Sequence, residues 1–233
     1  MTRTHGSTLD AWPARTHGPE SSCARLGARR TRPAISAAVS IGVRPCMQSF
    51  VVVSGLPASG KSTLAKELAA QLQVAHFDKD DFLERLFCSR RSITPSERSA
   101  LSRQADLKFQ EQAILQACGV LSSWWRHPNS TATSGTPIAW LLSPETAVIE
   151  VHCDCSVQVA LERFKARTRH AAHCDAQREP EALLKQFEEA HALGPLFPAH
   201  ALMCNTSNHV SAPNLAALVA QLRCRTVVAS KAS

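Results

Sequence analysis

The sequence lacks any apolar run near the roughly 18 residues that a membrane-spanning helix requires. It also lacks a Cys-x-x-Cys pair, and its nine cysteines are an odd number. Both cysteine features argue against a secreted disulfide framework and favour buried, reduced thiols. With 44% hydrophobic and 19% charged residues, the composition is that of an ordinary globular protein. We therefore expect a soluble, cytoplasmic protein, and 233 residues suffice for one α/β domain.

Acidic residues are scarce in residues 1–46, which hold only Asp10 and Glu20 beside seven arginines and no lysine. This segment carries most of the formal net charge of +7, so the rest of the chain is close to neutral. Its composition and its lack of a sustained apolar period predict a disordered basic leader. A working targeting signal is one alternative, but we favour a dispensable leader or a natural start at Met47. The domain is then expected to span residues 47–233.

The only two cysteines close together in the sequence are Cys153 and Cys155. With His152 beside them, and His170, His173 and Cys174 further on, they would form a zinc site only if a lid folded back over them. The spacing matches no established zinc pattern, so we interpret these residues as scattered polar and core positions.

Hydrophobic periodicity divides residues 49–222 into alternating strands and helices. The predicted strands lie at 50–53, 74–78, 119–123, 147–152 and 201–204. The predicted helices lie at 63–72, 80–87, 94–117, 156–168, 180–193 and 214–222. Residues 128–144, rich in Ser, Thr, Gly and Pro, are predicted to form a loop at a rim or over a site. This alternation predicts an α/β fold with a parallel, five-stranded sheet and helices on both faces.

A glycine-rich loop follows the first predicted strand and opens a predicted helix. Its sequence, GLPASGKS, fits G-x-x-x-x-G-K-S in full. Such a loop turns several backbone N–H groups toward an anion, and the helix dipole adds positive potential. Lys61 would reach the β- and γ-phosphates, and the Ser62 hydroxyl would ligate Mg²⁺. We therefore predict a three-layer P-loop NTPase in which ATP is bound by Gly55, Leu56, Pro57, Ala58, Ser59, Gly60, Lys61, Ser62 and Thr63.

The stretch from Ser49 to Asp81 resembles the P-loop kinase family that includes zeta toxins, chloramphenicol phosphotransferase, polynucleotide kinases and the shikimate and gluconate kinases. In that family an acidic cluster follows the second strand near the acceptor hydroxyl, and Asp78-Lys79-Asp80-Asp81 occupies the matching place. The resemblance implies that Asp80, and next Asp78, orients or deprotonates the acceptor and that Asp80 helps hold Mg²⁺. Asp81 is a candidate substrate contact. Alternatively, these acids only cap the following helix.

A second resemblance to the same kinases covers Val159 to Asp175, where the family carries an arginine-bearing lid. Arg163 and Arg167 lie four residues apart and are expected to share one helix face, with Arg169 at the helix end. A guanidinium can bridge phosphate oxygens during transfer, so Arg163 and Arg167 are candidate catalytic residues and Arg169 a candidate nucleotide contact. The plain alternative is a solvated basic helix face.

The third strand departs from the kinase pattern. Many relatives end this strand with an aspartate that serves magnesium, whereas this sequence has Ser122 and Ser123, which leaves the second magnesium ligand undefined. Arg126 is a candidate contact for an anionic acceptor, and Trp124 and Trp125 either wall its pocket or pack in the core. Asn205-Thr206-Ser207 stands where relatives contact adenine.

These features favour an ATP- and Mg²⁺-dependent kinase that acts on a small-molecule hydroxyl, without a membrane partner. A nucleic-acid end kinase that uses the basic leader is one alternative. Another is a nucleotide-binding NTPase or regulatory module without transfer activity. The acceptor itself is not encoded in a readable motif.

Overall fold

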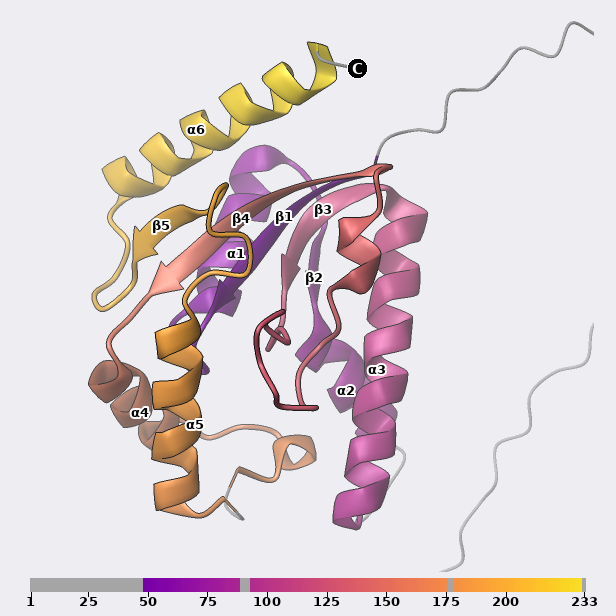
Figure 1. The fold of residues 1–233 in the computed structure, drawn as a ribbon, viewed down its shortest axis with the longest axis vertical. Helices are drawn as coiled ribbons and strands as arrows, with labels where there is room; N and C mark the ends of the chain where they lie inside the picture. The colour runs from indigo at the N-terminus through magenta and orange to yellow at the C-terminus, as the bar shows by residue number, and fades with distance from the viewer. Residues whose placement is uncertain (1–47, 89–92, 176–177, 232–233) are drawn as a thin grey trace, which may run out of the picture. The chain divides into compact units, whose positions relative to one another are not determined.

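The central sheet has five parallel strands in the order β2-β3-β1-β4-β5 (Figure 1). The computed structural model describes residues 48–88, 93–175 and 178–231, so the predicted leader at 1–46 lies outside the described residues. The strands are β1 (Gln48–Gly55), β2 (His76–Asp78), β3 (Cys118–Ser122), β4 (Thr146–Asp154) and β5 (Leu202–Asn205). The predicted five-stranded parallel α/β fold is therefore confirmed.

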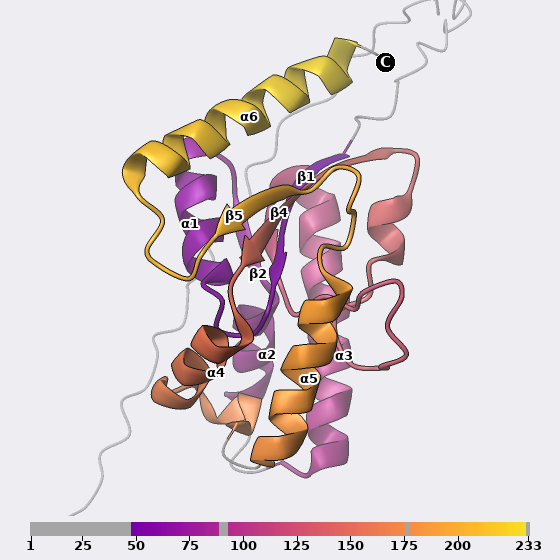
Figure 2. The same ribbon diagram turned by 60° about the vertical axis from the view of Figure 1, so that its left-hand side comes forward.

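Helices cover both faces of the sheet (Figure 2). One face packs against α1 (Lys61–Leu72) and α6 (Ala212–Lys231), and the other packs against α3 (Pro95–Gln116) and the short 3-10 helix η1 (Ala139–Leu142). The remaining helices are α2 (Lys79–Phe87), α4 (Val157–Ala166), η2 (Ala171–His173) and α5 (Pro180–Leu193).

Strand β1 forms the centre of the core because its side chains alternate between the two faces. Val51 and Val53 pack on the side of α1 and α6, whereas Phe50 and Val52 pack on the side of α3 and η1. All four side chains are buried. A strand buried on both faces needs a continuous apolar run, which explains why this segment was readable from sequence.

The segment 128–144 is more ordered than the predicted loop. Its residue Thr136 pairs with Trp125 as an isolated bridge, and η1 then packs Leu141 into the core against β1. The turn includes Gly135 at φ 96°, where a Cβ would lie 3.0 Å from the backbone nitrogen of Arg126. The predicted location at a rim holds for residues 133–136, which line the cleft described below.

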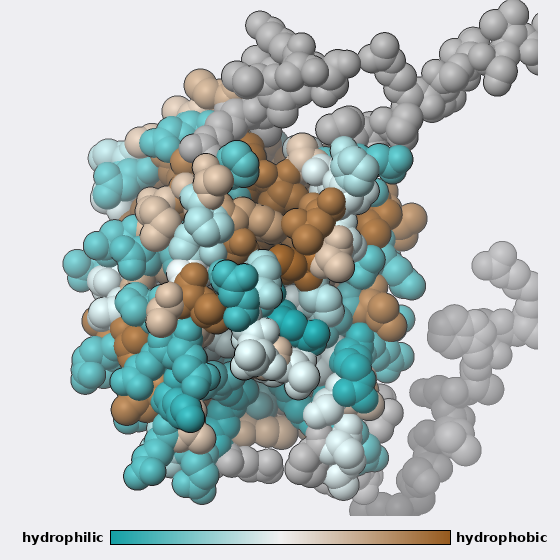
Figure 3. All heavy atoms as spheres, viewed as in Figure 1, coloured by the Kyte–Doolittle hydropathy of each residue, from teal (hydrophilic) through white to brown (hydrophobic). Residues whose placement is uncertain are grey.

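Hydrophilic side chains cover the face over α4 and α5, in the lower half of Figure 3, and hydrophobic side chains gather higher up over the sheet. No described helix is long and apolar enough to span a membrane.

Candidate functional site

The loop between β1 and α1 has the backbone geometry of an anion-binding site. Ala58 and Gly60 both adopt positive φ angles, 61° and 96°. Gly60 is the N-cap of α1, and no side chain caps the helix there. The first-turn N–H groups therefore have no side-chain acceptor and can bind an anion, which the helix dipole also favours.

Gly55 lets the loop pass close to β4. Its φ is +127°, and a Cβ at this position would lie 2.7 Å from the carbonyl oxygen of Cys153. Beyond it Leu56 is buried in a cluster with Leu161 and Phe164 of α4. The loop is thus held by packing on one side, while Pro57 to Thr63 line a cleft.

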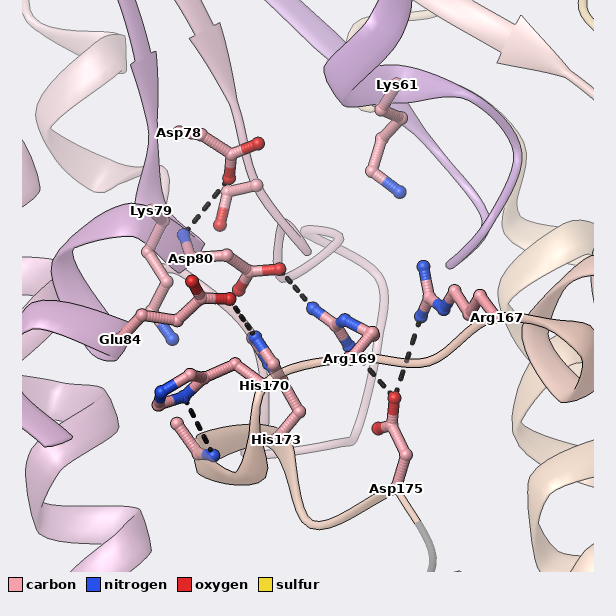
Figure 4. Close-up of polar contacts among 12 residues, drawn as sticks. Lys61, Asp78, Lys79, Asp80, Glu84, Arg167, Arg169, His170, His173 and Asp175 are labelled. Carbon is pink, nitrogen blue, oxygen red and sulfur yellow. Dashed lines mark hydrogen bonds and ion pairs between the residues drawn. The ribbon is translucent and has the colours of Figure 1, made fainter. Parts of the chain in front are cut away.

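The Lys61 side chain folds back on this loop. Its Nζ donates to the carbonyl oxygens of Gly55 (3.1 Å) and Leu56 (2.6 Å). Burial lowers the pKa of Lys61 to about 8, because desolvation disfavours the ammonium form more than Asp80 and Asp78 stabilise it. The amine lies on the cleft side of the loop and faces Arg167 (Figure 4).

Two of the three predicted carboxylates reach the cleft. Asp78 is buried at the end of β2, and its Oδ1 accepts the backbone N–H of Asp80 at 3.0 Å as the N-cap of α2. Asp80, two residues further along the chain, lines the cleft and forms an ion pair with Arg169 (Figure 4). Asp81, the predicted substrate contact, is exposed and does not line the cleft as described. Successive helix positions point about 100° apart, so Asp80 and Asp81 do not share a direction.

Arg163 and Arg167, two of the three predicted lid arginines, do not share a helix face. Helix α4 ends at Ala166, two residues before the predicted end, and Arg167 is an extended C-cap with φ −85° and ψ 143°. The prediction of one shared face was therefore wrong, because it required the helix to continue. Arg163 instead donates to the carbonyl oxygens of Thr206 (2.8 Å) and Ser207 (2.6 Å), and so fixes the loop after β5.

Arg167 is the arginine nearest to the Lys61 side of the cleft. Its guanidinium lies 4.6 Å from the centre of the Phe164 ring, and its Nη2 lies 4.0 Å from Asp175 Oδ2. Burial, and next the charge of Arg169, lower the pKa of Arg167 to about 10. An anion that enters the cleft would stabilise the charged form of the Arg167 guanidinium.

The segment after α4, residues 167–175, is docked against α2 and α3, and we call it the lid. Arg169 contacts Asp80 and also Asp175, at 3.3 Å. His173 Nε2 lies 2.8 Å from Glu84 Oε1 on α2, and burial lowers the pKa of this histidine (Figure 4). On α3, Arg98 Nε donates to the carbonyl oxygen of Ala172 at 3.2 Å.

The wall opposite the phosphate loop contains residues that the sequence reading missed. Asp106 of α3 accepts the Thr136 hydroxyl at 2.7 Å, and Lys79 Nζ lies 4.0 Å from the same oxygen. Lys79 also donates to Ser102 at 2.7 Å. The sequence feature that could have revealed them is the helical spacing of polar residues in the predicted helix at 94–117. A polar helix face is also expected wherever a helix is exposed to solvent, so this spacing alone does not identify a cleft.

Arg126 and the two tryptophans take different positions. Arg126 lines the cleft, but its guanidinium donates to the carbonyl oxygens of Thr133 and Gly135 and thereby holds that turn. Trp125 is buried, and its Nε1 donates to Val53 O at 2.9 Å, so it packs in the core. Trp124 is half-buried and lines the cleft.

The end of β3 offers hydroxyl groups where many kinases place an aspartate. Ser122 Oγ lies 3.0 Å from His76 Nε2, and Ser122 does not line the cleft as described. Ser123 does line it and contacts the Thr136 hydroxyl at 2.5 Å. Neither serine brings a carboxylate to the end of β3, and the carboxylates that act on Lys61 of the phosphate loop are Asp80 and Asp78.

The cleft has a volume of about 990 Å³. It runs over the carboxyl ends of the strands, where ligands bind in open α/β sheets. This volume suffices for a nucleotide together with a small second molecule. Its other boundary is formed by Thr206 and by 208–210, and a Cβ on Gly60 would come within 4.0 Å of Thr206.

The residues considered for zinc do not converge. Among the described residues, no group of three or more His, Cys, Asp or Glu side chains is placed to hold a metal ion. Cys153 and Cys155 are buried, and desolvation raises the pKa of Cys153 to about 12. These cysteines are core residues behind the phosphate loop.

Comparisons with known proteins agree with this geometry. Residues 50–193 match the model of a family described as an AAA domain. A comparison with curated proteins found no match.

Among solved structures, a candidate kinase from Chloroflexus aurantiacus J-10-fl is similar, with 23% identity and a TM-score of 0.61 over 76% of this chain and 97% of that one. Shikimate kinase from Bacteroides thetaiotaomicron matches with 17% identity and a TM-score of 0.44, over 75% of this chain and 96% of that one. At 23% identity the likeness to the first of these structures describes the fold alone.

Proposed function

The chain belongs to the AAA-domain family AAA_33, a P-loop kinase-like family, and we propose that it is an ATP-dependent phosphotransferase that phosphorylates a hydroxyl group of a small molecule. One observation carries this proposal. The uncapped phosphate loop, the Asp80 carboxylate and the arginines of the lid all line the same cleft. Nucleotide binding alone does not require a carboxylate in the same cleft that can take a proton from a second molecule.

The nucleotide would bind with its phosphates on the loop at 55–63. The N–H groups of the first turn of α1 would donate to phosphate oxygens, and Lys61 would exchange its two carbonyl partners for the β- and γ-phosphates. Ser62 is exposed in that first turn, Asp78 lies at the end of β2, and Asp80 lies in the first turn of α2. Their oxygens are of the kind that Mg²⁺ prefers, and the ion would neutralise phosphate charge when bound.

The transfer step would use Asp80 as the base. Its carboxylate takes the proton of the acceptor hydroxyl, the hydroxyl oxygen forms a bond to the γ-phosphorus, and the bond from that phosphorus to the β–γ bridging oxygen breaks to release ADP. Asp80 is paired with Arg169 in the structure. The γ-phosphate would compete with Asp80 for the Arg169 guanidinium. If Arg169 moves to the phosphate, the Asp80 carboxylate is free to act as a base, and the guanidinium stabilises the negative charge of the phosphate.

The lid arginines divide this work. Arg167 and Arg169 lie on the lid and would contact the phosphates, while Arg163 would act at a distance by holding the loop at 206–207 in place. Closure of the lid would also exclude water, which otherwise competes with the acceptor for the γ-phosphate.

The test is to incubate the full chain with magnesium and γ-labelled ATP together with a panel of hydroxyl-bearing metabolites. We expect the label to appear in an acceptor, and we expect Lys61→Ala to abolish the transfer. Lys66→Ala is the matched control, because Lys66 is exposed on α1 and does not line the cleft. Equal transfer by the Lys61→Ala variant would contradict the proposal.

A second function, a nucleotide-binding module without transfer activity, is favoured by one observation. The strand β3 ends in Ser122, whose hydroxyl is engaged with His76, where many kinases have an aspartate. In that case the chain binds the magnesium nucleotide, Lys61→Ala weakens this binding, and no panel member becomes labelled.

A further inference from the structure

One face of α3 forms a polar wall of the cleft that the nucleotide scheme above does not use. Its members recur at helical spacing over two turns, about 12 Å of helix. They are Arg98, Ser99, Ser102, Arg103 and Asp106. Helical spacing places these side chains on one face, and all of them line the cleft. Ser99 and Arg103 are also exposed, whereas the other three are half-buried.

Asp106 is held so that one of its oxygens remains available. Its Oδ1 accepts the Thr136 hydroxyl and faces Lys79, while Oδ2 makes no hydrogen bond or ion pair among the described residues. Thr136 is fixed in turn by Ser123. A carboxylate oxygen held in this way can accept a hydroxyl of a bound molecule without first breaking a contact.

Positive charge on this wall exceeds what its own carboxylate can balance. Within the described residues, Arg103 has neither a hydrogen bond nor an ion pair, although it lines the cleft. Arg98 donates one hydrogen bond to the lid, from its Nε to the carbonyl oxygen of Ala172. Its pKa is lowered mainly by burial and next by the charge of Arg178. The half-buried Arg98 guanidinium beside another cation favours the approach of an anion, and the exposed Arg103 guanidinium adds a second positive charge on the same wall.

The whole cleft shows the same imbalance. Nine lysine and arginine side chains line it, against four aspartate and glutamate side chains. A magnesium nucleoside triphosphate carries roughly two negative charges, so its binding leaves positive charge uncompensated. On the α3 wall itself, Arg98 and Arg103 outnumber the one carboxylate, Asp106.

We propose that the α3 wall is the acceptor site and that it selects a small hydroxylated anion, a carboxylic acid or a phosphate ester. The negative group lies on Arg103 and Arg98, and Asp106 Oδ2 accepts a hydroxyl. This inference rests on the proposed function, because it names the class of molecule that the same cleft phosphorylates. It does not extend to a macromolecular anion, since the anion-binding groups lie within the cleft beside the lid.

The experiment measures binding in the absence of turnover. The full chain is saturated with magnesium and a non-hydrolysable ATP analogue, and is then titrated with two matched series: glycerol, glycerate and glycerol 3-phosphate; and glucose, gluconate and glucose 6-phosphate. Calorimetry reports the affinity for each compound. We expect a charged member of at least one series to bind at least about tenfold more tightly than its neutral parent.

Variants locate the site. Arg103→Gln is expected to weaken binding of the anion about tenfold or more, and Asp106→Asn to weaken it while leaving the affinity for the nucleotide analogue unchanged. Lys108→Gln, on the same helix but exposed outside the cleft, is the control and leaves both affinities unchanged. A carboxylate or a phosphate preference identifies the anion.

The inference is overturned if neutral and charged members bind equally, if none binds, or if Arg103→Gln has no effect. Its failure is distinct from failure of the proposed function. Label transfer to neutral polyols alone would support the proposed phosphoryl transfer and contradict the anion selectivity. Anion binding without label transfer to any compound would support the anion site and contradict phosphoryl transfer.

Discussion

At the residue scale, Lys61 couples protonation to ligand binding. Its pKa is lowered to about 8 because burial destabilises the ammonium form more than the neighbouring acidic groups stabilise it. At pH 8 about half of the ligand-free molecules therefore carry a neutral Lys61, while at pH 6.5 nearly all are charged. Phosphates beside the amine favour the charged form and raise its pKa.

We predict that the protein takes up about half a proton when it binds a magnesium nucleotide at pH 8, and almost none at pH 6.5. The uptake is measured by calorimetry in buffers of different ionisation enthalpy. Lys66→Met is the control and keeps the same uptake. If uptake at pH 8 equalled that at pH 6.5, Lys61 would not be the group that meets the phosphates.

Asp80 and Asp81 make a natural matched pair, since they are adjacent in sequence but only Asp80 lines the cleft. We predict that Asp80→Asn preserves nucleotide affinity while lowering phosphoryl transfer by on the order of a hundredfold or more. Asp81→Asn is expected to change transfer by less than about threefold.

The measurement compares initial rates of label transfer with calorimetric affinities for both variants. A parental transfer rate in Asp80→Asn would remove Asp80 from the role of base. A large loss in Asp81→Asn would restore the substrate contact that the sequence suggested and that the cleft geometry does not favour.

At the scale of elements, a buried carboxylate ties the loop after α5 to the centre of the sheet. Glu150 of β4 is fully buried, and it accepts the backbone N–H groups of Leu196 (2.9 Å) and Phe197 (2.7 Å). Ser54, directly before the phosphate loop, donates to the same carboxylate, and His152 lies beside it. These hydrogen bonds lower the pKa of Glu150 although burial opposes them.

We predict that Glu150→Ala lowers the free energy of unfolding by about 3–5 kcal/mol, because it leaves several buried donors unpaired. Glu150→Gln keeps one acceptor oxygen and should lose less. Urea unfolding followed by circular dichroism measures both. Glu145→Ala, at an exposed position before β4, should cost under about 0.5 kcal/mol; a similar cost for Glu150→Ala would show that this network does not stabilise the fold.

Some helices and strands could be predicted from their local sequence, and others could not. The run at 50–53, the capping box at Thr94 and the glycine loop each carry a local signal, and the structure contains a strand, a helix start and a turn there. The end of α4 carried no such signal, because no glycine or proline follows Ala166 and the arginines that continue the pattern favour helix. There the lid's contacts with α2 and α3 override local preference.

The α3 wall shows why a site is harder to read than a strand. Arg98, Ser102 and Asp106 have the spacing of a solvated helix face, and only the packing of the lid and of residues 133–136 turns that face into a cleft. Arg163 and Arg126 were identified from sequence as anion contacts, but backbone carbonyls take up their donors. The partners of Arg163, Thr206 and Ser207, are far away in the chain and leave no local pattern, whereas those of Arg126 lie in the turn at 133–135, whose conformation the sequence did not predict.

At the scale of the whole molecule, the strand order brings the functional segments together. Because β1 lies between β3 and β4, the phosphate loop emerges between the end of β3 and the end of β4, with the acidic turn after β2 on one side and the loop after β5 on the other. The lid crosses from α4 to α2 and α3 through Arg169, His173 and the Arg98 contact. The sequence predicted five parallel strands but not which neighbours they have, since pairing between distant strands is a property of the folded chain.

The claim on which the account depends is that the loop at 55–63 binds the phosphates of a magnesium nucleotide. Calorimetric titration of the full chain with magnesium and a non-hydrolysable ATP analogue tests it most directly. The account predicts one saturable site whose affinity falls on the order of a hundredfold in Lys61→Ala and is unchanged in Lys66→Ala. Absence of binding, or equal affinity in the parental protein and Lys61→Ala, would contradict it.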